Sequence, residues 1–383
     1  MKMQRKLDRK EQLAVYRRRY QGRGIRGKSH LLDEFCEHYG YERKYAIKLL
    51  GGAMAPMISK RSPPGPEPKY RAILEVVEQV WRAAEQLCGK RLVEALPLWL
   101  PHYERHYGKL LPSQEKLIGR VSAATLDRLL AGKKARFSKG LGGTKPGTLL
   151  RHQVPVQGEV WNERRVGFME ADSVAHCGSS LAGNFIWSLT YTDLACTWTE
   201  GRAIWNKGSG GVLDQTRDVE SELPFAILGF DFDNGSEWLN WTLIRYLQVR
   251  TKPIQLSRSR PYHKDDNAHV EQKNWMWPRQ LLGYGRLEQA EMVSPINRLY
   301  KEVWGPLHNF FLPSMKLVKK WRVGSRWVRR YDVAQTAYQR LLSSGQLKGA
   351  QLARLRDRYE SLDPFKLAAQ LEQRLKPILR SSS

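Results

Sequence analysis

Apolar residues recur every three to four positions near the start of the chain, and one glycine interrupts them. The repeat predicts two short helices within residues 29–50, with the break at Gly40. Its apolar members are Leu31, Leu32, Phe35, Cys36, Tyr45, Ile47, Leu49 and Leu50. This spacing is typical of a helix-turn-helix, whose second helix lies in the major groove of DNA. We therefore expect Arg43, Lys44 and Lys48 on the second helix to contact DNA; the alternative is an ordinary helical hairpin with solvated basic residues.

A second helical pattern follows a proline-rich stretch. Residues 59–70, SKRSPPGPEPKY, predict an extended, semi-rigid spacer. Helical spacing resumes within residues 111–136, where Ser122 is expected to cap a helix that carries Asp127 and Arg128. We interpret this segment as a second helix-turn-helix, with a plain helical pair as the alternative.

From residue 161 the apolar positions form short runs separated by turn residues, as in β-strands. The runs occupy residues 165–174, 183–194, 196–205, 224–233 and 252–258. Helical segments near 209–222 and 237–250 flank the fourth run, and a further helix is expected to begin near Asp266. Three strands, a helix, a strand, a helix and a strand predict a mixed five-stranded α/β layer.

Charge divides the chain into a central segment and two basic flanks. The 383 residues include 64 Lys and Arg against 38 Asp and Glu, a formal net charge of +26. Residues 161–300 hold only 15 of these basic residues against 17 of the acids. A surface this basic attracts polyanions, so nucleic acid is the expected partner. The distribution predicts that the flanks grip this partner and that the centre carries the chemistry.

Two basic segments favour the same partner. Residues 132–152 contain six Lys and Arg, five Gly and no acid, a composition that follows phosphates rather than packing a core. Residues 316–330 place seven Lys and Arg around two tryptophans without an acid, which suits a phosphate backbone and unstacked bases. The alternative for residues 316–330 is a solvated pair of strands anchored by the tryptophans. The rest of the C-terminal region is expected to be mostly helical.

Several other classes of site and location are not favoured. The four cysteines include no C-x-x-C pair, so neither a disulfide framework nor a structural zinc site is expected. His102 and His106 are four residues apart but have no third ligand nearby. The start of the chain lacks the apolar segment of a signal peptide, and no run is long enough to span a membrane. We expect a soluble, cytoplasmic, nucleoid-associated protein with no membrane partner.

Three acids of the central segment stand where a predicted strand ends or a predicted helix begins. Asp172 follows VGFMEA, Asp233 follows ILGFDF, and Glu271 lies in DDNAHVEQKN. Buried carboxylates without partners are unstable as anions, so a cluster of ionised carboxylates implies a cation among them. Oxygen ligands favour Mg²⁺ or Mn²⁺, and two such ions roughly 4 Å apart can support an in-line phosphoryl displacement.

Neighbouring residues offer alternatives for these roles. Asp231 shares a strand face with Asp233 and could be the ligand instead, although the turn after Asp233 favours the latter. Asp193 is expected to be structural. Asn267 shares a helical face with Glu271, and Lys273 could hold a phosphate.

The residues around the three acids resemble a known family. Asp172, the motif DNGSEW with Asp233, and the motif SRPYHKDDNAHVEQ with Glu271 are similar to the catalytic core of bacterial insertion-sequence transposases, the DDE superfamily related to retroviral integrases. The acids are 61 and 38 residues apart, and the second spacing is slightly longer than is usual in the family. A small insertion near 258–266 would account for the difference. The resemblance covers residues 161–290.

The resemblance implies a fold and a reaction. It implies a ribonuclease-H-like core in which Asp172, Asp233 and Glu271 are catalytic and hold two Mg²⁺ (or Mn²⁺) ions. Water would attack at the transposon end to free a 3′-hydroxyl, and that hydroxyl would attack target DNA. The partners would be double-stranded transposon ends and target DNA, with a homo-oligomer, dimer or tetramer, on the paired ends. The three acids by themselves indicate only metal-dependent phosphoryl transfer.

Together these observations predict a multi-domain chain. Its expected parts are a helix-turn-helix domain (1–55), a proline-rich linker (56–69), a second helical or helix-turn-helix domain (70–135), a basic linker (136–160), an integrase-like α/β core (161–300) and a basic, mostly helical C-terminal region (301–383). The expected DNA contacts are Arg43, Lys44, Lys48, Arg128, Lys133, Lys134, Arg136, Lys273, Lys319, Lys320, Arg322 and Arg326. Two other classes remain: a sequence-specific DNA-binding protein with an idle integrase-like core, and a metal-dependent structure-specific nuclease.

Overall fold

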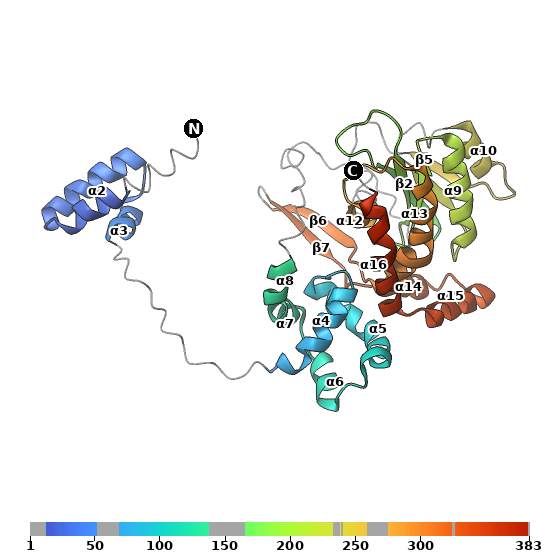
Figure 1. The fold of residues 1–383 in the computed structure, drawn as a ribbon, viewed down its shortest axis with the longest axis horizontal. Helices are drawn as coiled ribbons and strands as arrows, with labels where there is room; N and C mark the ends of the chain where they lie inside the picture. Colours follow the sequence, from blue (N-terminus) through green and yellow to red (C-terminus); the bar gives the residue numbers. More distant parts are fainter. Residues whose placement is uncertain are drawn as a thin grey trace. The chain divides into compact units, whose positions relative to one another are not determined.

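The chain divides into two compact units. The computed structural model describes residues 13–51, 69–137, 165–232, 238, 240–258, 275–323 and 326–381. Its internal contacts separate residues 1–68 from residues 69–383 (Figure 1). The boundary falls within the proline-rich stretch expected to act as a spacer. None of the described helices is long and apolar enough to cross a membrane.

The first unit is a small cluster of helices. Residues 13–21 are helical, and α2 (Ile25–Tyr39) and α3 (Arg43–Gly51) follow. α2 ends at Gly40, whose φ of 66° and ψ of 26° are left-handed, a conformation that glycine adopts because it has no Cβ. The Gly40 amide donates to the Cys36 carbonyl oxygen at 2.8 Å. The two helices and the break expected at Gly40 are therefore confirmed.

The core of the first unit uses a different face of α3 from the one that the apolar repeat suggested. Its buried residues are Leu32 and Phe35 of α2 with Ala46 and Leu50 of α3. Tyr45 and Ile47 are 50% and 45% exposed. Because Ala46 and Leu50 are four residues apart and share a helical face, the small alanine packs inward and its larger neighbours point to solvent.

The second unit begins with a group of helices: α4 (Leu74–Ala83), α5 (Gly89–Tyr107), α6 (Pro112–Ile118), α7 (Ala123–Leu129) and α8 (Ala131–Phe137), preceded by the 3-10 turn η1 (Arg71–Ile73). Ser122 caps α7 as expected, and its hydroxyl accepts from the Thr125 amide at 3.2 Å. Gly89 lies so close to α7 that a Cβ would sit 2.2 Å from the Ala123 carbonyl oxygen. The Gly89 amide donates to Asp127 Oδ1 at 2.9 Å, which fixes α5 against α7.

A five-stranded mixed sheet forms the centre of the second unit. Its strands are β1 (Phe168–Ala175), β2 (Ile186–Asp193), β3 (Thr199–Trp205), β4 (Gly229–Phe232) and β5 (Gln255–Arg258). They lie in the order β3-β2-β1-β4-β5, in which β1, β2 and β3 are antiparallel and the pairs β1–β4 and β4–β5 are parallel. Helices α9 (Ser209–Glu222) and α10 (Trp241–Gln248) supply the crossovers that parallel strands require. The predicted order of strands and helices is confirmed, and the chain is a mixed α/β protein.

The helices α9 and α10 cover one face of the sheet. Tyr191 of β2 shares a hydrogen bond of 3.0 Å with Thr216 of α9. Trp238, just before α10, is buried and packs edge-on against Tyr191 with ring centroids 5.7 Å apart. Arg202 of β3 is 1% exposed, and its Nε donates to Asp218 Oδ2 of α9 at 2.6 Å. Aromatic packing and this buried ion pair therefore hold α9 and α10 on the sheet.

Helical turns cover the other face of β2 and β3. They are the π-helical turn η4 (Trp275–Arg279), α12 (Gln280–Leu282), the 3-10 turn η5 (Ala290–Met292), α13 (Val293–Leu299) and the π-helical turns η6 (Tyr300–Trp304) and η7 (Leu307–Phe311). A Cβ at Gly201 would lie 2.9 Å from the Trp277 ring, so the glycine allows this close packing. The Tyr300 hydroxyl lies 2.9 Å from Ser188 Oγ, which lies 2.8 Å from His176 Nε2.

The C-terminal region combines a hairpin with three helices: β6 (Leu317–Val323), β7 (Arg326–Tyr331), α14 (Ala337–Ser343), α15 (Gly349–Ser361) and α16 (Pro364–Arg380). α16 packs against α5 and α13 (Figure 1). The Trp99 indole of α5 donates to the Phe311 carbonyl oxygen at 3.0 Å and packs edge-on against Phe365 of α16. Helices from both ends of the second unit thus share one core with the sheet.

Candidate active site and nucleic-acid surfaces

Asp172 lies in the middle of β1, one residue beyond the last position at which β1 pairs with β4, so the expectation that the first strand ends near this residue is wrong. Its partly buried carboxylate accepts from the Ser173 amide at 2.6 Å. The register pairs Ala171, the residue before Asp172, with Phe232, the last residue of β4. The sequence continues from Phe232 directly to Asp233, and consecutive Cα atoms are about 3.8 Å apart. Asp233 and Glu271 themselves lie outside the described residues.

Two more acids share the face of the sheet that carries Asp172. Glu170 is buried two residues before Asp172, so it lies on the same side of β1. The register pairs Glu170 with Asp231 of β4. Asp231, the alternative ligand at this strand, accepts a hydrogen bond from the Ser257 hydroxyl of β5. This face therefore presents carboxylates on two adjacent parallel strands.

The oxygen chemistry of this face fits Mg²⁺ or Mn²⁺. Both ions prefer carboxylate ligands, and the carboxyl ends of adjacent parallel strands are a usual place for a ligand. Within the described ranges, no three His, Cys, Asp or Glu side chains come together as an ion site. Two of the three predicted ligands, Asp233 and Glu271, lie outside those ranges, so the predicted site rests on Asp172 and on the register of β1 and β4.

Asp193 has the structural role expected from the sequence. It is fully buried, its Oδ2 accepts from the Gly167 amide at 2.7 Å, and its Oδ1 accepts from the Cys196 amide at 2.7 Å. Burial raises its pKa, and these amides act in the opposite direction. Asp193 thus closes the turn between β2 and β3 and lies on the face opposite Asp172, as their register shows.

The histidine pair of α5 joins two helices. His106 Nε2 lies 2.8 Å from Asp363 Oδ2, and Asp363 caps α16. His102 is buried against the Phe311 ring, and burial lowers its pKa. The four-residue spacing that could suggest a metal site is explained by this contact between α5 and the C-terminal region.

The predicted DNA contacts of the first unit differ in their surroundings. Arg43 donates to Asp33 and to Ser29 Oγ, the latter at 2.6 Å, so α2 holds its guanidinium. Lys44 and Lys48 are exposed on α3 next to the exposed Tyr45. The face of α3 that points away from the core is therefore basic and aromatic.

In the second unit, two lysines of α8 form salt bridges with neighbouring helices. Lys133 Nζ lies 2.8 Å from Glu78 of α4, and Lys134 Nζ lies 2.5 Å from Asp127 of α7. The hydrogen bond from Lys133 holds the pKa of Glu78 below its usual value. Arg128 is exposed and lies along its own helix, where its Nε donates to the Ala124 carbonyl oxygen at 3.2 Å. The side chains of Arg136, Lys320 and Arg326 and all of Lys273 lie outside the described residues.

Residues 316–330 form the strand pair that the sequence left as an alternative. The register of β6 and β7 pairs Lys319 with Arg330 and Lys320 with Arg329, so basic positions oppose each other. Arg322 pairs with Trp327, which is 44% exposed. Like charges on directly opposed positions destabilise a hairpin, and phosphates placed between them would relieve the repulsion.

Salt bridges and hydrogen bonds anchor the base of this hairpin. The Lys316 amide donates to Asp332 Oδ1 at 2.6 Å, and Arg340 Nη1 of α14 lies 2.6 Å from Asp332 Oδ2. Lys316 Nζ donates to the Leu194 carbonyl oxygen at 2.7 Å, in the turn after β2. The basic positions further along the hairpin are thus presented from a fixed base.

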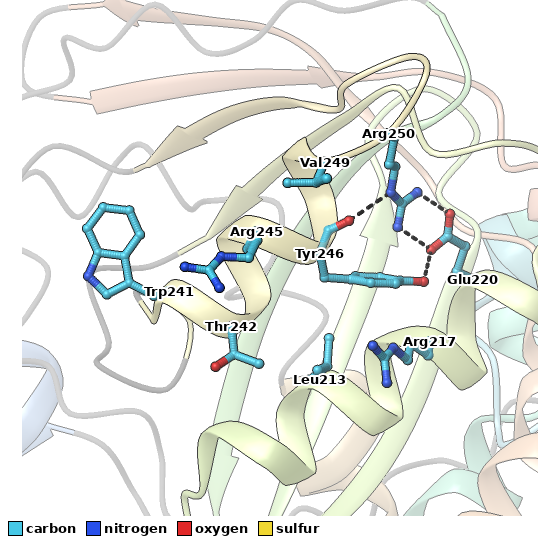
Figure 2. A pocket seen from close by; sticks show the side chains of 9 residues that line it. All are labelled: Leu213, Arg217, Glu220, Trp241, Thr242, Arg245, Tyr246, Val249 and Arg250. Atoms are coloured by element: carbon cyan, nitrogen blue, oxygen red, sulfur yellow. Dashed lines mark hydrogen bonds and ion pairs between the residues drawn. The ribbon is translucent and has the colours of Figure 1, made fainter.

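One basic surface had no signal in the sequence analysis. A groove between α9 and α10 is lined by arginines and by the exposed Trp241 (Figure 2). Its residues come from two helices that the sequence separates by a strand, so a linear pattern could not bring them together. The exposure of Trp241 is itself a property of the folded chain, so it was not visible in the sequence.

The fold and these surfaces define a mixed α/β protein with basic helical flanks. No protein-family model matches the chain. The uncharacterized protein y4rM of Sinorhizobium fredii (strain NBRC 101917 / NGR234) is 38% identical over 329 residues, which cover 82% of this chain and 89% of that protein. The chain therefore belongs to the same family as y4rM.

Proposed function

We propose that the chain is a DDE-type DNA transposase, which cleaves and joins DNA strands by metal-dependent phosphoryl transfer. The observation that carries the proposal is the register of β1 and β4. Ala171 pairs with Phe232, and the residues that follow this pair in the sequence are Asp172 and Asp233. Carboxylates from adjacent strands are the ligands that a divalent cation at this site would require.

The order of the sheet supports a ribonuclease-H-like core. A three-stranded antiparallel meander is followed by α9, β4, α10 and β5, with β4 inserted beside β1. The pairing brings Phe232, the last residue of β4, beside Ala171 of β1, although the two aspartates that follow these residues are 61 residues apart in the sequence. In the first unit, α2, the turn at Gly40 and α3 support a helix-turn-helix with Lys44 and Lys48 on its outer face.

The chain's own residues have distinct tasks in this proposal. Asp172, Asp233 and Glu271 would hold Mg²⁺ or Mn²⁺, and the acidic face with Glu170 adds attraction for a cation. The bound ions would activate the attacking oxygen and stabilise the leaving oxygen of an in-line displacement. The Ser173 amide orients the Asp172 carboxylate. The basic hairpin and α3 would bind phosphates of double-stranded DNA and position the scissile bond.

The proposed reaction has two steps on one site. Water attacks the phosphodiester at the transposon end and releases a 3′-hydroxyl, and this hydroxyl then attacks a phosphodiester of the target DNA. Each step exchanges one P–O bond for another, so neither ATP nor a covalent enzyme intermediate is needed. Two paired ends call for a homo-oligomer of this chain.

Nicking of supercoiled plasmid tests the proposal. We expect the wild type to relax the plasmid when Mg²⁺ is present and to stop when a chelator is added. Asp172→Asn should remove nicking because it deletes a ligand charge, with duplex affinity nearly unchanged because the basic surfaces remain. Asp214→Asn, an exposed acid on α9, is the matched control and should nick normally.

The other outcomes separate the alternative functions. A wild type that binds duplex DNA but never nicks it would be a DNA-binding protein with an idle core. Preferential cleavage of an RNA–DNA hybrid over duplex DNA would indicate a structure-specific nuclease. Full nicking by Asp172→Asn would contradict the role given to this residue.

A further inference from the structure

A groove between α9 and α10 forms a second basic surface on the α/β core. Its walls include Leu213, Arg217 and Glu220 of α9 and Trp241, Arg245 and Tyr246 of α10 (Figure 2). Its volume of about 560 Å³ admits a nucleotide-sized group. α9 covers the face of the sheet that holds Tyr191, whereas Asp172 points to the opposite face. The groove is therefore separate from the carboxylates.

The floor of the groove is a fixed assembly around Tyr246. Glu220 accepts two hydrogen bonds from Arg250, at 2.5 and 2.8 Å, and one from the Tyr246 hydroxyl at 2.6 Å. The guanidiniums of Arg250 and Arg217 lie 4.4 and 4.9 Å from the Tyr246 ring centroid, on opposite sides of the ring (Figure 2). Glu220 is thus neutralised by Arg250, and the charge that remains in the groove is positive.

Two arginines of the groove keep their charge available. Arg217 and Arg245 are exposed, and across the part of the chain that the structure describes neither forms an ion pair with a carboxylate. Arg245 follows Trp241 by four residues and so shares its helical face, and its guanidinium extends toward the indole (Figure 2). An anion in the groove would meet both guanidiniums.

Trp241 supplies an aromatic surface at one end of the groove. Its side chain is 80% exposed, whereas Trp81, Trp99, Trp198 and Trp238 are fully buried. Trp241 is the first residue of α10 and comes eight residues after Asp233 in the sequence. An exposed indole beside exposed guanidiniums is the combination with which proteins bind single strands, because the ring stacks on a base and the cations bind the phosphates.

We propose that the α9–α10 groove binds single-stranded DNA, with a base stacked on Trp241 and phosphates on Arg245 and Arg217. A duplex offers phosphates but keeps its bases stacked inside, so Trp241 selects the unpaired strand. The inference deepens the proposed transposase function and rests on it, because a cleaved end frays and so exposes an unpaired strand. The groove holds the strand on the side of the sheet away from Asp172.

Binding of a short, fluorescent oligothymidylate to the full-length chain tests the proposal. We expect Trp241→Ala to weaken binding by roughly 5- to 150-fold, the range for loss of one stacked base. Trp241→Phe should retain most of the affinity because it keeps a ring. Replacing Arg217 and Arg245 by Gln should reduce the salt slope by about 1.4, because each phosphate contact on a single strand contributes about 0.7.

A matched control uses two exposed arginines of another helix. Arg354→Gln combined with Arg356→Gln on α15 removes the same charge and should leave oligothymidylate binding unchanged. Duplex binding, measured in parallel, should fall far less than single-strand binding in the groove variants. Equal losses for the two DNA forms, or an unchanged affinity of Trp241→Ala, would overturn the proposal.

Two further measurements separate the remaining outcomes. If groove variants lose polyglutamate binding and keep oligothymidylate binding, the groove takes an acidic peptide and the proposal is wrong. Asp172→Asn should bind oligothymidylate like the wild type. If the protein nicks DNA but strand binding does not depend on the groove, only the groove proposal is wrong. If strand binding depends on the groove but no nicking occurs, only the proposed catalysis is wrong.

Discussion

Single carboxyl groups show how burial, rather than residue type, decides their role. Asp193 accepts hydrogen bonds from backbone amides and closes a turn, Asp218 pairs with the buried Arg202, and Asp172 lies within β1 with an orienting amide. All three were acids near predicted strands or helices. Only the register of β1 with β4 distinguishes Asp172, because the residue before it, Ala171, pairs with Phe232, and Asp233 follows Phe232 in the sequence.

Glu85 gives a prediction for the pH dependence of stability. It connects α4 and α5 with a left-handed φ of 54°, and burial raises the pKa of its carboxyl to about 7. Because the folded state favours the protonated form, the stability is full below the ordinary pKa and is lost as pH rises through about 7. Glu85→Gln mimics the protonated form, so it should stabilise the protein by up to ~3 kcal/mol at alkaline pH and hardly at all at acidic pH.

Chemical denaturation on both sides of neutrality measures this difference. Glu115→Gln, an exposed residue of α6, is the control and should show no pH-dependent gain. An equal effect of Glu85→Gln at acidic and alkaline pH would show that titration of Glu85 is not the cause.

At the scale of elements, the ion pair that joins β3 to α9 gives a second prediction. Arg202 is buried and donates to Asp218 Oδ2 and, at 3.2 Å, to Glu200 Oε2. Arg202→Met should destabilise the protein by about 3–5 kcal/mol, because two carboxylates then lose their buried partner. Lys301→Met, which removes the more exposed partner of Asp218 at 3.0 Å, should cost about 1 kcal/mol or less. Thermal unfolding compares the two, and equal losses would contradict the burial argument.

The hairpin β6–β7 predicts opposite effects on stability and on DNA binding. Lys319→Glu places opposite charges across the pair with Arg330, so it should stabilise the hairpin by about 0.2–1 kcal/mol. The same change should weaken duplex binding and lower its salt dependence, because one phosphate contact is lost. Unfolding and binding are measured on the same samples. Lys348→Glu, exposed outside the hairpin, is the control, and a loss of both properties in Lys319→Glu would contradict the register argument.

Sequence periodicity predicted the elements well and their neighbours poorly. The strands, the crossover helices, the break at Gly40 and the cap at Ser122 all have local causes, and all are confirmed. The order β3-β2-β1-β4-β5 depends on which strand β4 joins, and the alternation of residues within one strand carries no record of that choice. For the same reason the charge opposition within the hairpin and the α9–α10 groove became visible only in three dimensions.

The sequence likewise did not show which acids surround the basic residues. Lys133 and Lys134 looked like part of a phosphate-binding run, yet each reaches an acid more than six residues away in sequence, Glu78 and Asp127. Arg43 is held by Asp33 across the turn of the first unit. Their assignment as DNA contacts stays a prediction, and DNA would have to compete with these acids for them.

For the whole molecule, the division at residue 68 predicts that selective DNA binding and catalysis can be separated. The second unit buries its own core of sheet and helices, so residues 69–383 should fold without the first unit. Under the proposed function, we expect this fragment to retain Mg²⁺-dependent nicking while losing preference for the transposon ends, because α3 is absent. Competition between end DNA and random duplex measures the preference. An unchanged preference would show that the first unit does not read the DNA sequence.

The contact of Trp99 with Phe311 and Phe365 makes completion of the second unit's core depend on the end of the chain. α5 packs on α4 and α7, which precede or follow it closely in the sequence, but the Trp99 indole finds its hydrogen-bond and ring partners only at residues 311 and 365. During synthesis, a nascent chain that has not yet reached residue 311 therefore leaves this indole without those partners, and the first helices of the second unit reach their full packing only when the last helix is made.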